Sequence, residues 1–167
     1  MRFILAFLFI VFAHSSSWAQ NKLDKTLKKF NKESVPYVSV EDLSAESVLL
    51  LDTRKKEEYE VSHLKDALWV GHKEFNEKDI LAKIPNREES IVVYCSIGVR
   101  SENIGERLMA MGYTNVQNLY GGIFEWKNKD GKVYNLKEKE TDSVHAFNKH
   151  WGKLLLKGEK IYDAPNR

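Results

Sequence analysis

The sequence predicts an α/β fold built on a mainly parallel β-sheet. Short apolar runs typical of buried strands alternate along the chain with segments whose apolar residues recur at helical spacing. The clearest run, Ser90 to Tyr94, leads through a short glycine-containing loop into such a helical segment. The 167 residues, 43% hydrophobic and 30% charged, have the composition of a globular protein of roughly one domain.

The first predicted element is a short helix in a lysine-rich lead, residues 20–33, where Leu23, Leu27 and Phe30 form one apolar stripe. After it the patterns predict strands at 37–40, 48–51 and 67–70, and helical segments at 41–47, 55–61 and 79–83. The run at 48–51 is continuously apolar, which is typical of a strand that is buried on both faces of a parallel sheet.

The second half of the domain continues with strands at 90–94 and 116–119. Between them, Ile104, Leu108 and Met111 predict a helix over 101–111, and Gly112 follows where a left-handed C-terminal cap is favoured. Residues 128–167 are charged and weakly patterned, with one apolar cluster at 151–156. About forty residues make a poor independent core, so we expect this C-terminal extension to pack on the domain.

Residues 1–19 have the pattern of a secretory signal peptide rather than of a folded element. Arg2 supplies a positive charge, Phe3 to Ala13 is apolar, and small residues precede Gln20. The apolar run is too short to span a bilayer of about 30 Å as a helix. An uncut anchor and a buried helix are the alternatives. We expect a secreted or bacterial periplasmic protein that begins at Gln20 and is not stably inserted in the membrane.

Charge and cysteine content exclude several classes of function. Lys and Arg number 26 and Asp and Glu 24, and the resulting net charge of +2 is too small to indicate nucleic acid as a partner. The single cysteine excludes an internal disulfide, a CxxC redox pair and a thiolate-rich metal site. In an exported protein, an unpaired thiol indicates reactivity or an outside partner.

The candidate nucleophile is Cys95, which directly follows the clearest strand. The carboxyl ends of parallel strands form the edge at which open α/β folds bind ligands. Loop amides, the start of the next helix and Arg100 all favour a thiolate, which is the reactive form of cysteine. Gly98 suits a loop whose amides converge on one point. The alternative is a structural cysteine buried at a strand end. The candidate substrate-binding loop comprises Ser96, Ile97, Gly98, Val99 and Arg100.

These motifs resemble the rhodanese domain family over residues 34–127. The upstream match comprises Asp52, Arg54, Glu58, Tyr59, His63, Leu64 and Ala67. The downstream match comprises Cys95 to Ser101, Gly112, Tyr113, Val116, Leu119 to Ile123, and Trp126. Each piece is weak by itself, but together, in order and at the family's spacing, they form a strong signal.

The resemblance implies a five-stranded parallel sheet flanked by helices, and a Cys95 that accepts a sulfane sulfur as a persulfide. The implied donor is a thiosulfate, a thiosulfonate or a persulfide, and the implied acceptor is cyanide or a thiol. An exported protein is a further candidate partner. No cofactor is implied. Arg100 matches the family's loop arginine, which would hold an anionic donor or set the shape of the loop.

One departure from the family concerns the residue after the nucleophile. Thiosulfate-using rhodaneses commonly have Arg or Lys there, whereas this chain has Ser96 followed by Ile97. With one cation fewer, the attraction for a dianionic donor should be weaker. The departure makes thiosulfate a doubtful natural donor.

Two alternative functions stay open at this point. Related folds with a loop from Cys to Arg hydrolyse phosphate esters or reduce arsenate, but they commonly place five residues between the two, whereas here four residues separate Cys95 from Arg100. The other alternative is a non-catalytic binding or sulfur-carrier module.

Asp52 and Arg54 are candidate supporting residues, since they lie at the end of the strand at 48–51 and should be near the same sheet edge. They could position the loop or the donor, but a structural ion pair is the preferred interpretation. His63 is interpreted as a hydrogen-bonded packing residue. His72, His145 and His150 lack ligand spacing, so no metal site is expected.

Two further groups of residues receive structural interpretations. We expect Trp69, Trp126 and residues 154–156 to belong to the core rather than to a substrate platform. Glu102 and Asn103 lie at the start of the helix after the loop. They could stabilise the positive N-terminal end of this helix electrostatically, and they are also typical of solvated positions.

Overall fold

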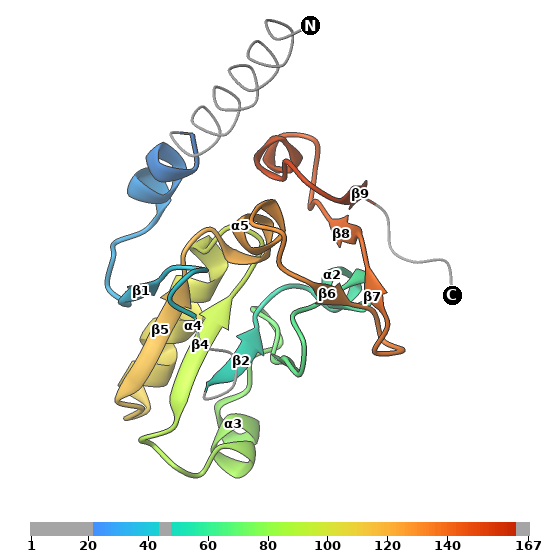
Figure 1. Cartoon of the computed structure of the whole chain (residues 1–167). Helices are drawn as coiled ribbons and strands as arrows, with labels where there is room; N and C mark the ends of the chain where they lie inside the picture. Colours follow the sequence, from blue (N-terminus) through green and yellow to red (C-terminus); the bar gives the residue numbers. More distant parts are fainter. Residues whose placement is uncertain (1–21, 44–47, 163–167) are drawn as a thin grey trace, which may run out of the picture.

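The computed structural model of the protein describes residues 22–43 and 48–162. A five-stranded sheet lies at its centre with the strand order β1-β5-β4-β2-β3, and every pair in it is parallel. This confirms the predicted five-stranded α/β architecture (Figure 1). The strands are β1 (Tyr37–Val38), β2 (Leu49–Asp52), β3 (Leu68–Trp69), β4 (Ser90–Tyr94) and β5 (Asn115–Leu119).

Helices cover both faces of this sheet because its central strands are apolar on both sides. Alternate residues of β4 enter different cores: Ile91 and Val93 pack with helices α3 (Glu77–Lys83) and α4 (Val99–Ala110). Val92 and Tyr94 pack on the opposite side with α5 (Gly122–Asn128), the helix at residues 22–30 and the C-terminal extension. Helix α2 (Lys56–Val61) joins β2 to β3.

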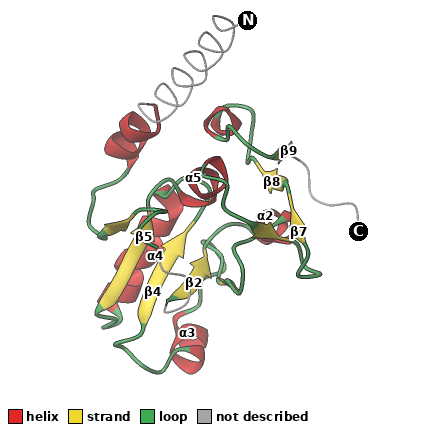
Figure 2. Ribbon diagram, viewed as in Figure 1, coloured by secondary structure: helices red, strands yellow, loops and turns green. Residues whose placement is uncertain are grey.

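The C-terminal extension contains more regular structure than its weak pattern predicts. An antiparallel pair is formed by β6 (Val133–Tyr134) and β7 (Glu140–Thr141), and a parallel pair by β8 (Ser143–His145) and β9 (Glu159–Ile161). The short 3₁₀ helix η1 (Trp151–Leu154) lies between β8 and β9 (Figure 2). Leu154 and Leu155 are buried in the same core as Tyr94, so the extension packs on the domain.

Several element boundaries differ from expectation, and one helix was not predicted. The helix that was not predicted is α5, which follows Gly121. In the sequence, Gly121 and Gly122 look like a turn that ends the preceding strand. Helix α3 begins earlier because the Asn76 side chain accepts hydrogen bonds from the amides of Lys78 and Asp79. The predicted helical turn at 41–47 falls partly, and the signal segment 1–19 wholly, outside the described residues. No helix in the described part of the chain is both long and apolar enough to cross a membrane.

Candidate active site

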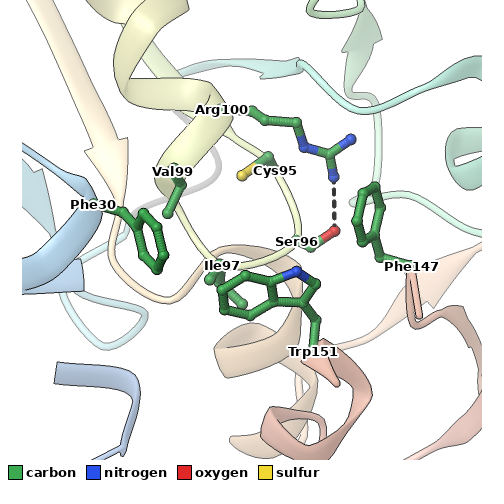
Figure 3. Close-up of a pocket in the computed structure, with 8 residues that line it drawn as sticks. All are labelled: Phe30, Cys95, Ser96, Ile97, Val99, Arg100, Phe147 and Trp151. Carbon is green, nitrogen blue, oxygen red and sulfur yellow. Dashed lines mark hydrogen bonds between the residues drawn. The ribbon is translucent and has the colours of Figure 1, made fainter. Parts of the chain in front are cut away.

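The cysteine loop lies at the carboxyl edge of the sheet, as the sequence predicts. β4 ends at Tyr94, Cys95 follows, and α4 begins at Val99. The thiol is buried, with the residue 1% exposed, yet it lines a pocket of about 280 Å³. A substrate in this pocket could therefore reach the sulfur atom from one side, while the protein encloses the atom on its other sides (Figure 3).

The surroundings of Cys95 favour its thiolate. Burial by itself raises the pKa of the thiol. The positive charge of Arg100 and hydrogen bonds from Ser101 and Gly98 act in the other direction and leave the pKa of Cys95 lowered. The amide of Gly98 donates to Sγ over 3.2 Å. The loop therefore raises the fraction of the nucleophilic form.

Gly98 has a left-handed backbone conformation, as expected for a loop whose amides converge on one point. Its φ of +106° is one that residues with a Cβ rarely adopt. Two asparagine side chains hold the carbonyl oxygen of Gly98. Asn118 Nδ2 donates to it over 2.8 Å and Asn31 Nδ2 over 3.0 Å. Asn118 also accepts from the Ser101 hydroxyl over 2.7 Å. Sequence reasoning missed both asparagines, since neither is near Cys95 in the sequence.

The start of α5 holds the other side of the loop. The amide of Ile123 donates to the Cys95 carbonyl over 3.0 Å, and the amide of Phe124 donates to that of Ser96 over 3.1 Å. Gly122, with a φ of +55°, permits this approach, because a Cβ there would lie 2.3 Å from the Cys95 oxygen. The Gly121-Gly122 pair therefore shapes the site from a distance in sequence.

Arg100 does not point its charge into the pocket unpaired. Its guanidinium forms two hydrogen bonds with the Glu58 carboxylate, of 2.6 and 2.8 Å, and a third with Ser96 Oγ of 2.9 Å. Ser96 Oγ also donates to Glu58 over 3.0 Å. Of the two roles expected for Arg100, this geometry favours setting the loop shape over holding an anionic donor.

Glu58 is the buried anchor of this network, and its importance was not recognised from the sequence beyond its place in a family motif. Burial raises the pKa of its carboxyl, but hydrogen bonds and charge from Arg100 outweigh that effect and lower the pKa to about 2. The side chain is therefore ionised at neutral pH. Arg100 carries a full positive charge and donates two hydrogen bonds to the carboxylate, so the charge and the acceptor oxygens of the buried Glu58 are both satisfied.

Asp52 and Arg54 form an ion pair that lies beneath the sheet edge rather than in the pocket. Both side chains are fully buried, and Arg54 Nη2 lies 2.5 Å from Asp52 Oδ2. Arg54 also donates to the carbonyl of Ser62 over 2.6 Å. Neither residue lines the pocket at Cys95. These contacts favour the structural interpretation of the pair.

His63 packs as the sequence suggested. It is 1% exposed, its ring stacks on Tyr59 with centroids 4.0 Å apart, and its backbone forms a bridge with Tyr134. No group of three potential metal-binding side chains occurs within residues 22–43 and 48–162.

Two expectations about side-chain placement were wrong. Glu102 is buried rather than solvated, because its carboxylate accepts the amides of Lys32 and Ser34 over 3.0 and 3.1 Å and so anchors the segment before β1. Leu156 is 45% exposed rather than in the core, whereas Leu155 before it is fully buried.

Three aromatic residues from outside the loop complete the pocket. Phe30 ends the helix at 22–30, Phe147 follows β8, and Trp151 begins η1. The rings of Phe30 and Trp151 meet edge to face with centroids 5.9 Å apart. Figure 3 shows the three side chains around the loop that carries Cys95. They were missed because they lie in charged segments whose path over the site depends on tertiary packing.

Comparison with protein families gives one match that covers most of the described chain: the family described as "Rhodanese-like domain" matches residues 36–129. Phe30, Phe147 and Trp151 lie outside the matched range. The family match therefore includes the cysteine loop and Glu58 but not the aromatic residues of the pocket.

Curated relatives include proteins named tRNA uridine(34) hydroxylase. The one from Photorhabdus laumondii is 34% identical over 84 residues, which are 48% of this chain and 24% of the relative. The one from Yersinia pestis is 35% identical over 112 residues, which are 64% of this chain and 31% of the relative. The chain thus spans less than a third of the length of these relatives.

Solved structures show the same fold. A thiosulfate sulfurtransferase from Pseudomonas aeruginosa matches with a TM-score of 0.55 and 25% identity, over 60% of this chain and 20% of that one. A rhodanese-related protein from Thermoplasma volcanium matches with a TM-score of 0.52 and 26% identity, over 59% of this chain and 96% of that one.

Proposed function

The chain belongs to the rhodanese-like domain family, and on that basis we propose that it is a sulfurtransferase in which Cys95 carries a sulfane sulfur as a persulfide. The observation that supports this most directly is the state of the thiol. Cys95 Sγ accepts the Gly98 amide, has a lowered pKa and lines a pocket. A thiolate held in this way is an activated nucleophile.

The proposed reaction balances without an added oxidant or reductant. The Cys95 thiolate attacks the terminal sulfur of a donor such as a thiosulfonate, forming a new S–S bond, while the bond between that sulfur and its old neighbour breaks and its electron pair leaves with a sulfinate. A thiolate acceptor then attacks the outer sulfur and restores the Cys95 thiolate. Loop amides near Sγ stabilise the negative charge on the outer sulfur between the two steps.

The loop residues have different proposed roles. Gly98 supplies an amide to the sulfur, Ser96 and Arg100 hold the loop to Glu58, and Ile97 and Val99 line the pocket. Asp52 and Arg54 support the sheet edge beneath the loop.

Other functions are less well supported by the geometry. The relatives' hydroxylase name belongs to proteins of which the chain covers less than a third, so we do not extend it to this chain. A phosphatase or arsenate reductase needs an arginine directed at its oxyanion, whereas Arg100 is paired with Glu58. A sulfur carrier would share the persulfide and differ in having no turnover, whereas in a non-catalytic binding module Cys95 would be incidental.

Export is also part of the proposal. The signal-like pattern of residues 1–19 would place the protein in a periplasm or outside the cell, where a thiol or an exported protein would receive the sulfur.

Intact-mass measurement tests the proposed function. After incubation with thiosulfate, a thiosulfonate or a small persulfide, the wild type should gain about 32 Da per sulfur, and Cys95→Ser should gain nothing, since the thiolate is the nucleophile. Addition of cyanide or a thiol should remove the added mass. No adduct with any of the donors would overturn the proposal, and turnover of an aryl phosphate would support the phosphatase alternative.

A further inference from the structure

The pocket above Cys95 is apolar, although sulfane donors are anions. Besides Cys95 and loop residues such as Ile97 and Val99, it is lined by the rings of Phe30, Phe147 and Trp151. At about 280 Å³ it lies near the lower end of the range of roughly 300–1,000 Å³ that holds small organic ligands. A donor composed only of sulfur and oxygen would leave these rings without a partner.

Arg100, the one cation among the described residues that line the pocket, is already paired. Arg100 is bound by both oxygens of Glu58, and its guanidinium carbon lies 5.1 Å from the centre of the Phe147 ring. Lys29 lies over the Phe30 ring at 5.3 Å and Lys55 over the Phe147 ring at 5.8 Å; neither lines the pocket. A dianion in the pocket would therefore meet apolar walls and one arginine whose charge is already shared with the Glu58 carboxylate.

Phe147 shows that the aromatic lining is a built feature. Its φ is +61°, a conformation in which a bulky side chain is an outlier that costs about 1 kcal/mol or more. The residue is nevertheless 37% exposed, so core burial alone does not explain why phenylalanine occupies this position. Its place in the lining of the pocket at Cys95 favours a role for the ring in contacting a ligand.

We propose that the pocket selects organic sulfane donors that carry one negative charge and an aromatic or similarly flat apolar group, in preference to thiosulfate. The proposal rests on the proposed persulfide function and names the substrate class of the same site. In an arenethiosulfonate, the terminal sulfur would face Cys95 and the aryl group would contact Phe147 and Trp151. Attack by the thiolate would transfer that sulfur to Cys95 and release an arenesulfinate with the electron pair of the broken S–S bond.

Donor kinetics test the proposal. Second-order rates of Cys95 persulfide formation, followed by intact mass, are compared for benzenethiosulfonate and methanethiosulfonate, which share the reacting group and the charge. Burial of the phenyl ring should make the benzene compound react about tenfold faster or more. A third arm with thiosulfate should be the slowest of the three.

Variants separate the pocket from the chemistry. Phe147→Asn removes the ring but suits a positive φ, so it should fold, and the preference for the benzene compound should fall to about threefold or less. Phe147→Tyr should keep the preference. Leu136→Ala is the matched control, since Leu136 is 54% exposed and does not line the pocket, and it should leave all three rates unchanged.

The outcomes distinguish the two proposals. Persulfide formation at equal rates with the benzene and methane compounds, or a preference that persists in Phe147→Asn, would overturn the aromatic selection while leaving the sulfurtransferase proposal intact. No persulfide with any donor would overturn the sulfurtransferase proposal itself.

Discussion

At the scale of single residues, the Glu58 carboxylate connects helix α2 to the cysteine loop. It accepts hydrogen bonds from Arg100, from Ser96 and from the amide of Lys55. Because Arg100 is bound to Glu58, we expect the loop arginine to act mainly by shaping the loop and by lowering the pKa of Cys95. The charge that lowers the pKa of the thiol is thus held in place by a carboxylate that lies outside the loop.

Replacement of Glu58 by glutamine should destabilise the protein. Loss of the negative charge leaves Arg100 partly buried without its counter-ion, so we expect a loss of about 2–3 kcal/mol in the free energy of unfolding at pH 7. Urea denaturation followed by tryptophan fluorescence measures it. Glu57→Gln, at the exposed neighbouring position, is the matched control and should change the value by less than about 0.5 kcal/mol.

The same comparison has a predictable pH dependence. The pKa of Glu58 is about 2 in the folded protein, against an ordinary value of 4.5, so its contribution is fully present above about pH 4.5 and is lost as the pH falls toward 2. The stability difference between wild type and Glu58→Gln should shrink over that interval. Equal stability of the two proteins at pH 7 would contradict the assigned role.

At the scale of elements, the start of α5 is a support for the loop. Gly122→Ala should lower the free energy of unfolding by about 3 kcal/mol, because the added Cβ would clash with the Cys95 carbonyl and alanine disfavours the positive φ at this position. The same clash should slow sulfur loading of Cys95. Gly112→Ala is the matched control. Its φ is +92° and nothing lies within 4 Å of the added carbon, so it should cost only about 1 kcal/mol and leave loading unchanged.

Urea denaturation gives the two stabilities, and intact mass after brief donor exposure gives the loading. The difference between the two glycine variants isolates the steric contact from the backbone conformation. Equal losses in both variants would show that α5 does not press on the loop.

Elements with strong local patterns were predictable. The strand β4 was expected over 90–94 and is found there, and the helix after the loop was expected from Ile104 and Leu108, which are fully buried. Helix α5 was not, because glycines are poor helix formers and mark turns. Here Gly121 directly precedes the helix and Gly122 is its first residue, and the positive φ angles of both turn the chain into the helix.

At the scale of the whole molecule, the sequence predicted the fold and the position of the loop that carries Cys95 but not the aromatic walls of the pocket. The cysteine, the glycine and the arginine lie within six residues of one another, so local spacing indicates them. Phe30 and Trp151 meet only because one helix before the sheet and one segment after it pack on the same face. No local pattern encodes that meeting, since it depends on burial of Leu23, Leu27 and Leu154 in a shared core.

The proposed export of the protein can be measured directly. On expression in a bacterium with a periplasm, the protein recovered from the periplasmic fraction should begin at Gln20, as the small residues before it favour cleavage there. N-terminal sequencing of that fraction reads the result. Recovery only in the cytoplasm, with Met1 or Arg2 at the start, would contradict the signal assignment.

The joining of early and late segments over Cys95 orders events during synthesis. The sheet and the cysteine loop can assemble from residues 37–128, but Phe147 and Trp151 leave the ribosome later. A partly made chain would therefore carry Cys95 and its loop without Phe147 and Trp151. If these rings select the donor as proposed, selectivity is the last property that the growing protein acquires.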